Sequence, residues 1–137
     1  MSLKIKRIII DTNLWISFLI TNDFKKLDQF LDPDKYQIVF SEELFNEFLE
    51  VVHREKFNRY FNDLNIKILI EIINDKALFV KVISIVNECR DLKDNFLLSL
   101  AIDGDVDYLI TGDNDLLSLK HFEKTSILTI NDFISTF

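Results

Sequence analysis

The run Ile8-Ile9-Ile10 constrains the fold more than any other stretch, because a carboxylate, Asp11, follows it directly. Three consecutive β-branched residues are typical of a strand buried on both faces, as in the centre of a parallel sheet. Ligands of open α/β sheets bind outside the carboxyl ends of the strands. This stretch alone leaves two interpretations of Asp11 open: a residue that takes part in chemistry, or a cap for the following helix.

Length and composition favour one globular domain over residues 1–137. Hydrophobic residues make up 48% and charged residues 28%, which is ordinary for a soluble protein. Phenylalanine occurs 13 times, and we interpret this as a large aromatic core rather than an apolar surface for a partner.

Several classes of protein do not fit the sequence. The chain has one cysteine and two histidines far apart in sequence, so we expect neither a disulfide framework nor a zinc site. No apolar run approaches the roughly 20 residues of a membrane span. Residues 1–7 lead straight into the first strand, so we expect no signal peptide and a cytoplasmic location. The net charge of −7 argues against coating of nucleic acid by bulk electrostatics, but not against an enzyme that acts on nucleic acid through bound cations.

Strand and helix signals alternate along the chain, which predicts an α/β fold with a mainly parallel sheet. Strands are expected at residues 5–11, 36–40, 79–86, 108–111 and 127–130. Helices or helical turns are expected at residues 14–20, 25–31, 42 to about 53 or 55, 57–61, 66–78, 94–104, 116–119 and 132–137. Asn13, Ser41 and Asn131 are the expected helix starts, and Gly104 is an expected helix end.

Four acids occupy equivalent places in this pattern. Asp11 ends one apolar strand, and Asp113 follows another after a single glycine. Glu47 borders the apolar arc of its helix, and Asp94 shares an apolar stripe with residues 97, 98 and 101. Each acid alone also fits a purely structural role, as a helix cap, a turn residue or a solvated side chain. Together, all four can reach one end of the sheet.

Such a cluster predicts a cation, because neighbouring carboxylates repel one another. Oxygen ligands without imidazole or thiolate select a hard divalent ion, Mg²⁺ or Mn²⁺. An ion of this kind can orient a phosphodiester, lower the pKa of a bound water and stabilise the leaving oxygen. The acids therefore favour a phosphodiesterase.

Four stretches resemble the motifs of PIN-domain ribonucleases, in order and over essentially the whole chain. They are Ile8-Ile9-Ile10-Asp11-Thr12-Asn13, residues 41–47, residues 90–97 with Leu100-Ala101, and residues 107–117. The resemblance implies a three-layer α/β/α sandwich, PIN-like and Rossmann-like, and a metal-dependent endoribonuclease. The compact form is similar to VapC-like toxins of type II toxin–antitoxin pairs, which implies an RNA substrate, a cognate antitoxin and pairing with a second copy.

The resemblance also implies roles by position. The metal-site acids would be Asp11, Glu47, Asp94 and Asp113. The accessory residues would be Thr12, Asn13, Thr111 and Asp115. Asp91 competes with Asp94, and we prefer Asp94 because it shares the apolar stripe.

A basic patch for RNA is less well marked. Arg54, Lys56 and Arg59 form the best candidate, although an ordinary solvated face fits them as well. Two other functions stay open. One is a catalytically silent PIN-like module that binds RNA or protein. The other is a phosphoacceptor domain, which needs an aspartate at the end of a middle strand; here the strands at 36–40 and 80–86 are followed by Ser41 and Asn87.

Overall fold

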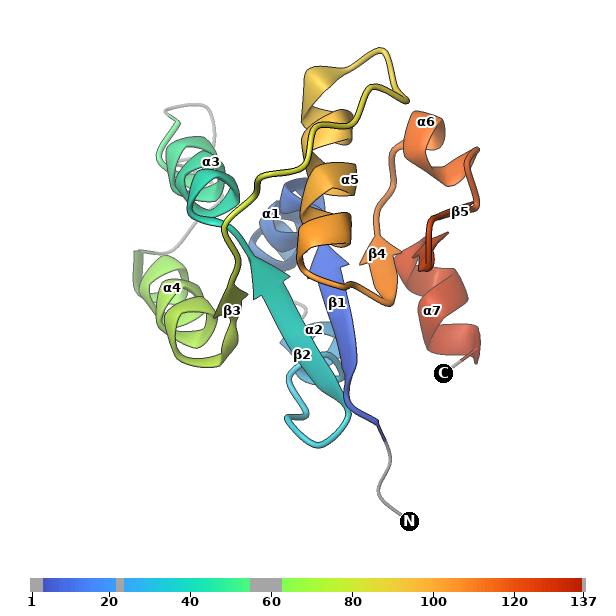
Figure 1. Cartoon of the computed structure of the whole chain (residues 1–137). Helices are drawn as coiled ribbons and strands as arrows, with labels where there is room; N and C mark the ends of the chain where they lie inside the picture. Colours follow the sequence, from blue (N-terminus) through green and yellow to red (C-terminus); the bar gives the residue numbers. More distant parts are fainter. Residues whose placement is uncertain (1–3, 22–23, 55–62, 137) are drawn as a thin grey trace.

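A six-stranded sheet forms the centre of the molecule, with strand order β3-β2-β1-β4-β6-β5 (Figure 1). The computed structural model describes residues 4–21, 24–54 and 63–136. The strands are β1 (Lys6–Ile10), β2 (Tyr36–Phe40), β3 (Leu78–Phe79), β4 (Tyr108–Ile110), β5 (His121–Phe122) and β6 (Thr125–Leu128). Only β5 runs antiparallel to its neighbour; the other pairs in the described sheet are parallel. The predicted mainly parallel sheet is confirmed.

Helices lie on both faces of this sheet, with α5 in front and α1 and α2 behind (Figure 1). They are α1 (Thr12–Thr21), α2 (Phe24–Asp28), α3 (Glu42–Val52), α4 (Asp63–Lys76), α5 (Leu92–Asp103), α6 (Asn114–Leu117) and α7 (Ile130–Thr136). The Ser41 side chain accepts a hydrogen bond from the Leu44 amide at 3.0 Å and caps α3, as predicted. Gly104 ends α5, also as predicted. The α/β/α sandwich expected from the sequence is therefore confirmed.

The core is built around β1 and a set of aromatic rings. Ile8, Ile9 and Ile10 are at most 1% exposed, as expected for a strand covered on both faces. Among the described residues, five phenylalanines are buried: Phe18, Phe30, Phe40, Phe48 and Phe133. The rings of Phe30 and Phe133 stack with centroids 5.1 Å apart, so α7 packs against the turn that follows α2. The aromatic-core interpretation of the phenylalanine content is thus confirmed.

The register of the sheet places two strand ends level with each other. Ile10 of β1 pairs with Ile110 of β4, and the Asp11 amide donates to the Ile110 carbonyl at 2.9 Å. Residues 11 and 111 therefore leave the sheet side by side, although 100 positions separate them in the chain.

The strand predicted at residues 79–86 is wrong beyond Phe79. The amides of Ile83 and Ser84 donate to one carboxylate oxygen of Asp103, at 2.6 and 2.8 Å, instead of to a neighbouring strand. The Ser84 hydroxyl donates to the other oxygen. Asp103 therefore anchors this segment to the end of α5.

Three smaller expectations near the C-terminal end also need correction. The last strand begins at Thr125, whose buried hydroxyl donates to the Val106 carbonyl at 2.6 Å, and the short strand β5 was not predicted. The Thr129 hydroxyl accepts from the Asp132 amide at 3.0 Å, so Thr129 takes the capping position that we assigned to Asn131. The turn expected at residues 57–61 lies outside the described residues.

Within the described part of the chain, no helix has the length and apolar character needed to cross a membrane.

Candidate metal centre

A cleft of about 450 Å³ opens at the carboxyl ends of β1 and β4. The start of α1, one face of α3, the first turns of α5 and the cap of α6 supply its walls. The structure brings all four predicted acids to it: Asp11, Glu47, Asp94 and Asp113. Thr12, Asn13 and Asp91 line it as well. Residues from four distant stretches of sequence therefore share one depression.

Asp11 is held in the cleft by hydrogen bonds from the residue that follows β4 and from the first turn of α1. One carboxylate oxygen accepts from the Thr111 hydroxyl at 2.8 Å, and the other accepts from the Asn13 amide at 3.4 Å. Burial raises the pKa of Asp11, the hydrogen bonds from Thr111 and Asn13 oppose that rise, and the charges of Glu47 and Asp113 add to it. The carboxylate is oriented, but it is costly to keep ionised without a cation.

Asp94 is the most deeply placed acid of the cleft. It is 5% exposed, and its Oδ2 atom has no hydrogen-bond partner among the described residues. Burial raises the pKa of Asp94 to about 6, and repulsion from Asp113, Asp91, Asp11 and Asp115 adds to the effect. A buried carboxylate oxygen without a partner carries a free-energy cost that a cation in the cleft would relieve.

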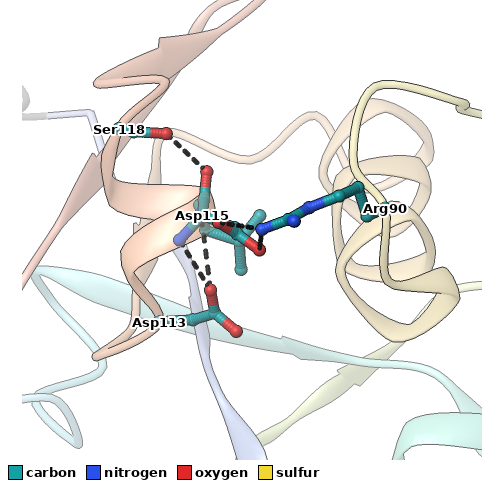
Figure 2. Close-up of polar contacts among 5 residues, drawn as sticks. Arg90, Asp113, Asp115 and Ser118 are labelled. Carbon is teal, nitrogen blue, oxygen red and sulfur yellow. Dashed lines mark hydrogen bonds and ion pairs between the residues drawn. The ribbon is translucent and has the colours of Figure 1, made fainter.

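Asp113 and Asp115 lie beside Asp94. The Asp113 carboxylate caps α6 by accepting from the amides of Asp115 and Leu116, at 2.8 and 3.4 Å (Figure 2). The Asp113 amide donates to the Thr111 hydroxyl at 3.1 Å, so Thr111 contacts both Asp11 and Asp113. One carboxylate oxygen from each of Asp94, Asp113 and Asp115 lies within 4.8 Å of the other two. These three acids could hold one metal ion, and Asp11 and Glu47 line the cleft that Asp94 and Asp113 also line.

The remaining predicted residues take different places. Asp91 is exposed and caps α5 by accepting from the Lys93 amide at 2.8 Å, so Asp94 rather than Asp91 joins the close group of acids. Thr12 is buried, and its hydroxyl has no partner among the described residues. Asn13 contacts Asp11 through its backbone amide.

Two basic residues at the acids were missed by the sequence analysis. Lys93 Nζ lies 3.4 Å from Glu47 Oε1, and Arg90 lies 3.5 Å from Asp115 (Figure 2). Both belong to the stretch 90–97, in which bases and acids alternate, and that alternation is the signal in the sequence that points to them. Of the predicted basic patch, Arg54 pairs with Glu50 on the surface of α3, and Lys56 and Arg59 lie outside the described residues.

The donor set fits a hard divalent cation. Six acids line the cleft in the described part of the chain, and neither histidine nor cysteine is among the lining residues there. Carboxylate oxygens select Mg²⁺ or Mn²⁺ over softer metals. The Oδ2 atom of Asp94, which no group in the described part of the chain contacts by a hydrogen bond, is available as a ligand atom.

Comparison with known proteins agrees with this arrangement. The family model described as PIN domain matches residues 7–115. The chain belongs to the PIN-domain family. PIN domains are generally nucleases and typically use divalent metals, and the matched residues of this PIN domain include all four acids predicted for the metal site.

A structural comparison supports the same fold. The crystal structure of PAE2754 from Pyrobaculum aerophilum superposes with a TM-score of 0.59, covering 96% of this PIN domain and 88% of that chain. The two sequences are 12% identical, so this similarity shows the fold alone. A comparison with curated protein sequences found no significant match.

Proposed function

We propose that this PIN domain is an endoribonuclease that depends on Mg²⁺ or Mn²⁺ and hydrolyses RNA phosphodiester bonds. The observation that carries the proposal is the group of Asp94, Asp113 and Asp115, whose carboxylate oxygens lie within 4.8 Å of one another. Asp94 and Asp113 line a cleft together with Asp11 and Glu47. One of these acids, Asp94, is buried with no partner for Oδ2 among the described residues. Acids grouped in this way can bind the metal ion that assists phosphodiester hydrolysis.

Each residue has a part in this scheme. Asp11, Glu47, Asp94 and Asp113 would hold the ion, and Asp115, close to Asp94 and Asp113, would support it. Thr111 orients Asp11 and the start of α6 through its hydroxyl. When bound, the ion orients the phosphodiester, lowers the pKa of a water and stabilises the leaving oxygen. Attack by water would leave a 3′-hydroxyl and a 5′-phosphate.

Cleavage of a mixed set of structured and unstructured RNAs tests the proposal, with Mg²⁺, with Mn²⁺ and with EDTA. We expect cleavage only with metal, and a loss of about 100-fold or more in Asp11→Asn and in Asp94→Asn. Asp75→Asn removes the same charge from the exposed surface of α4 and is the matched control. Circular dichroism would show that each variant folds.

Full activity of Asp11→Asn or Asp94→Asn would contradict the assignment of the site. If the wild type neither cleaves RNA nor binds a divalent ion in calorimetry, the catalytically silent PIN-like module becomes the better description.

We further propose that the chain is the toxin of a toxin–antitoxin pair. The support is the acidity of the cleft, where six acids face one base in the described residues. A partner protein that inserts a basic side chain would be attracted there by charge-assisted hydrogen bonds. Expression of the wild type should arrest bacterial growth, Asp94→Asn should not, and co-expression of the adjacent gene should restore growth to the wild type. Unimpaired growth on expression of a nuclease-active wild type would reject the toxin role.

A further inference from the structure

Lys93 occupies a distinctive place between the two helical walls of the cleft. It belongs to the first turn of α5, and its ammonium reaches to 3.4 Å from Glu47 Oε1 on α3. Among the cleft-lining residues that the structure describes, Lys93 is the one base beside six acids. Its backbone amide is fixed by the Asp91 carboxylate at 2.8 Å, so the base of the side chain is anchored at the edge of the acids.

We propose that Lys93 provides a binding position for a phosphate oxygen of the substrate, and that Glu47 holds its ammonium only until a divalent cation takes that carboxylate. This inference rests on the function proposed above. It assigns to Lys93 two successive partners, first an acid of the protein and then an anion of the RNA.

The negative charge of the cleft favours such a group. A polyanion that enters a cleft lined by six acids is repelled, and one divalent ion offsets only part of that charge. Lysine binds phosphate as a compact point charge on a flexible stem. Lys93 is therefore placed where the entering phosphate and the acids meet.

The pairing with Glu47 is weak enough to be exchanged. The Lys93 and Glu47 side chains are 69% and 33% exposed, and exposed pairs contribute little net stability. Loss of this pair on metal binding would therefore cost little. Arg90 is a poorer candidate, because its side chain is 90% exposed at Asp115 and it does not line the cleft.

Lys93→Met tests the proposal because it predicts opposite changes in two measurements. The first is kcat/KM for a fluorogenic single-stranded oligoribonucleotide at saturating Mn²⁺, over a series of salt concentrations. We expect a fall of about three- to tenfold, carried mainly by KM. A plot of log kcat/KM against log salt has a negative slope, and this slope should become less steep by about 0.7, the value for loss of one phosphate contact to a single strand.

The second measurement is Mn²⁺ binding by calorimetry without RNA. Removal of the competing ammonium should tighten Mn²⁺ binding by about twofold or more, since Glu47 is then free for the ion. Lys93→Arg should keep most of the wild-type kcat/KM and its salt dependence, because it keeps the positive charge. Lys67→Met, which removes one positive charge from the exposed surface of α4, should leave both measurements at wild-type values.

An unchanged salt slope in Lys93→Met would overturn the phosphate contact. Weaker or unchanged Mn²⁺ binding in that variant would overturn the exchange at Glu47 and point to a structural role. If the wild type cleaves no RNA, the proposed function fails instead, and the Mn²⁺ titration still decides separately whether Lys93 competes for Glu47.

Discussion

At the carboxyl group of Asp94, burial and four neighbouring acids act in the same direction and raise its pKa to about 6. The same group in an unfolded chain has a pKa of about 3.9. Between these two values the folded protein holds a proton that the unfolded chain has released. The free energy of unfolding of the metal-free protein therefore falls as pH rises from about 4 to about 6, and this destabilisation is fully present above pH 6.

Replacement of this one carboxylate should therefore stabilise the metal-free protein. In EDTA at pH 7.5, Asp94→Asn should raise the free energy of unfolding by on the order of 2 kcal/mol, because no buried charge must be kept without a partner. The gain should shrink toward pH 4.5, where the wild-type carboxyl is protonated. Urea denaturation at both pH values measures it. A variant less stable than the wild type at pH 7.5 would contradict the electrostatic account.

Thr111 is a positioning residue whose single hydroxyl contacts two parts of the site. Its hydrogen bond lowers the pKa of Asp11 against the effect of burial. Thr111→Val keeps the shape but should reduce cleavage about 10- to 100-fold and shift the acidic limb of the pH–rate profile upward. Thr111→Ser should retain the profile. An unshifted profile in Thr111→Val would show that the hydroxyl does not act on Asp11.

At the scale of the elements, the sequence predicted those parts whose signals are local. The isoleucine run predicted β1, Ser41 predicted the start of α3, and Gly104 predicted the end of α5. Gly104 also permits a close approach, because a Cβ atom there would lie 2.9 Å from the Leu100 carbonyl oxygen and 3.0 Å from the Val39 side chain. These features depend on residues near one another in sequence or on a single backbone position.

The parts that sequence could not predict depend on long-range partners. Residues 80–86 alternate like a strand, yet the acceptor for the Ile83 and Ser84 amides is Asp103, about 20 positions away. The four acids could be placed at one sheet edge from their patterns, but the approach of Lys93 to Glu47 depends on how α3 and α5 face each other. No periodicity within either helix encodes that geometry.

The segment after β3 should loosen when Asp103 is removed. Its hydrogen bonds with Ser84 and Ile83 lower the pKa of Asp103, so their stabilisation is present above pH 4 and is lost as pH falls through the lowered pKa. At pH 7, Asp103→Ala should cost about 1–2 kcal/mol and speed hydrogen exchange at the Ile83 and Ser84 amides. Divalent-ion binding should not change, since Asp103 does not line the cleft. Unaltered exchange at these two amides would refute this role.

At the scale of the whole molecule, the metal site and the fold should stabilise each other. The acids are contributed by the ends of β1 and β4 and by α3 and α5, so an ion that binds all of them binds the folded state alone. Such a ligand adds about 2.7 kcal/mol to stability at a concentration of 100 times its Kd.

Thermal denaturation measures this linkage. Addition of Mn²⁺ should raise the Tm of the wild type progressively with concentration, and EDTA should reverse the rise. In Asp94→Asn the shift should be absent or much smaller, although that variant starts from a higher Tm at pH 7.5. Equal Mn²⁺-induced shifts in the two proteins would mean that the ion binds elsewhere.

The hydrogen bond between Thr111 and Asp11 joins residues 100 positions apart. While a ribosome is still making the chain, Asp11 emerges long before the residues that complete the cleft. At about 5–20 residues per second, synthesis of such a length occupies several seconds. The nascent polypeptide therefore has no assembled acidic centre before the residues around Thr111 emerge, and any activity that needs the whole cleft is absent until then.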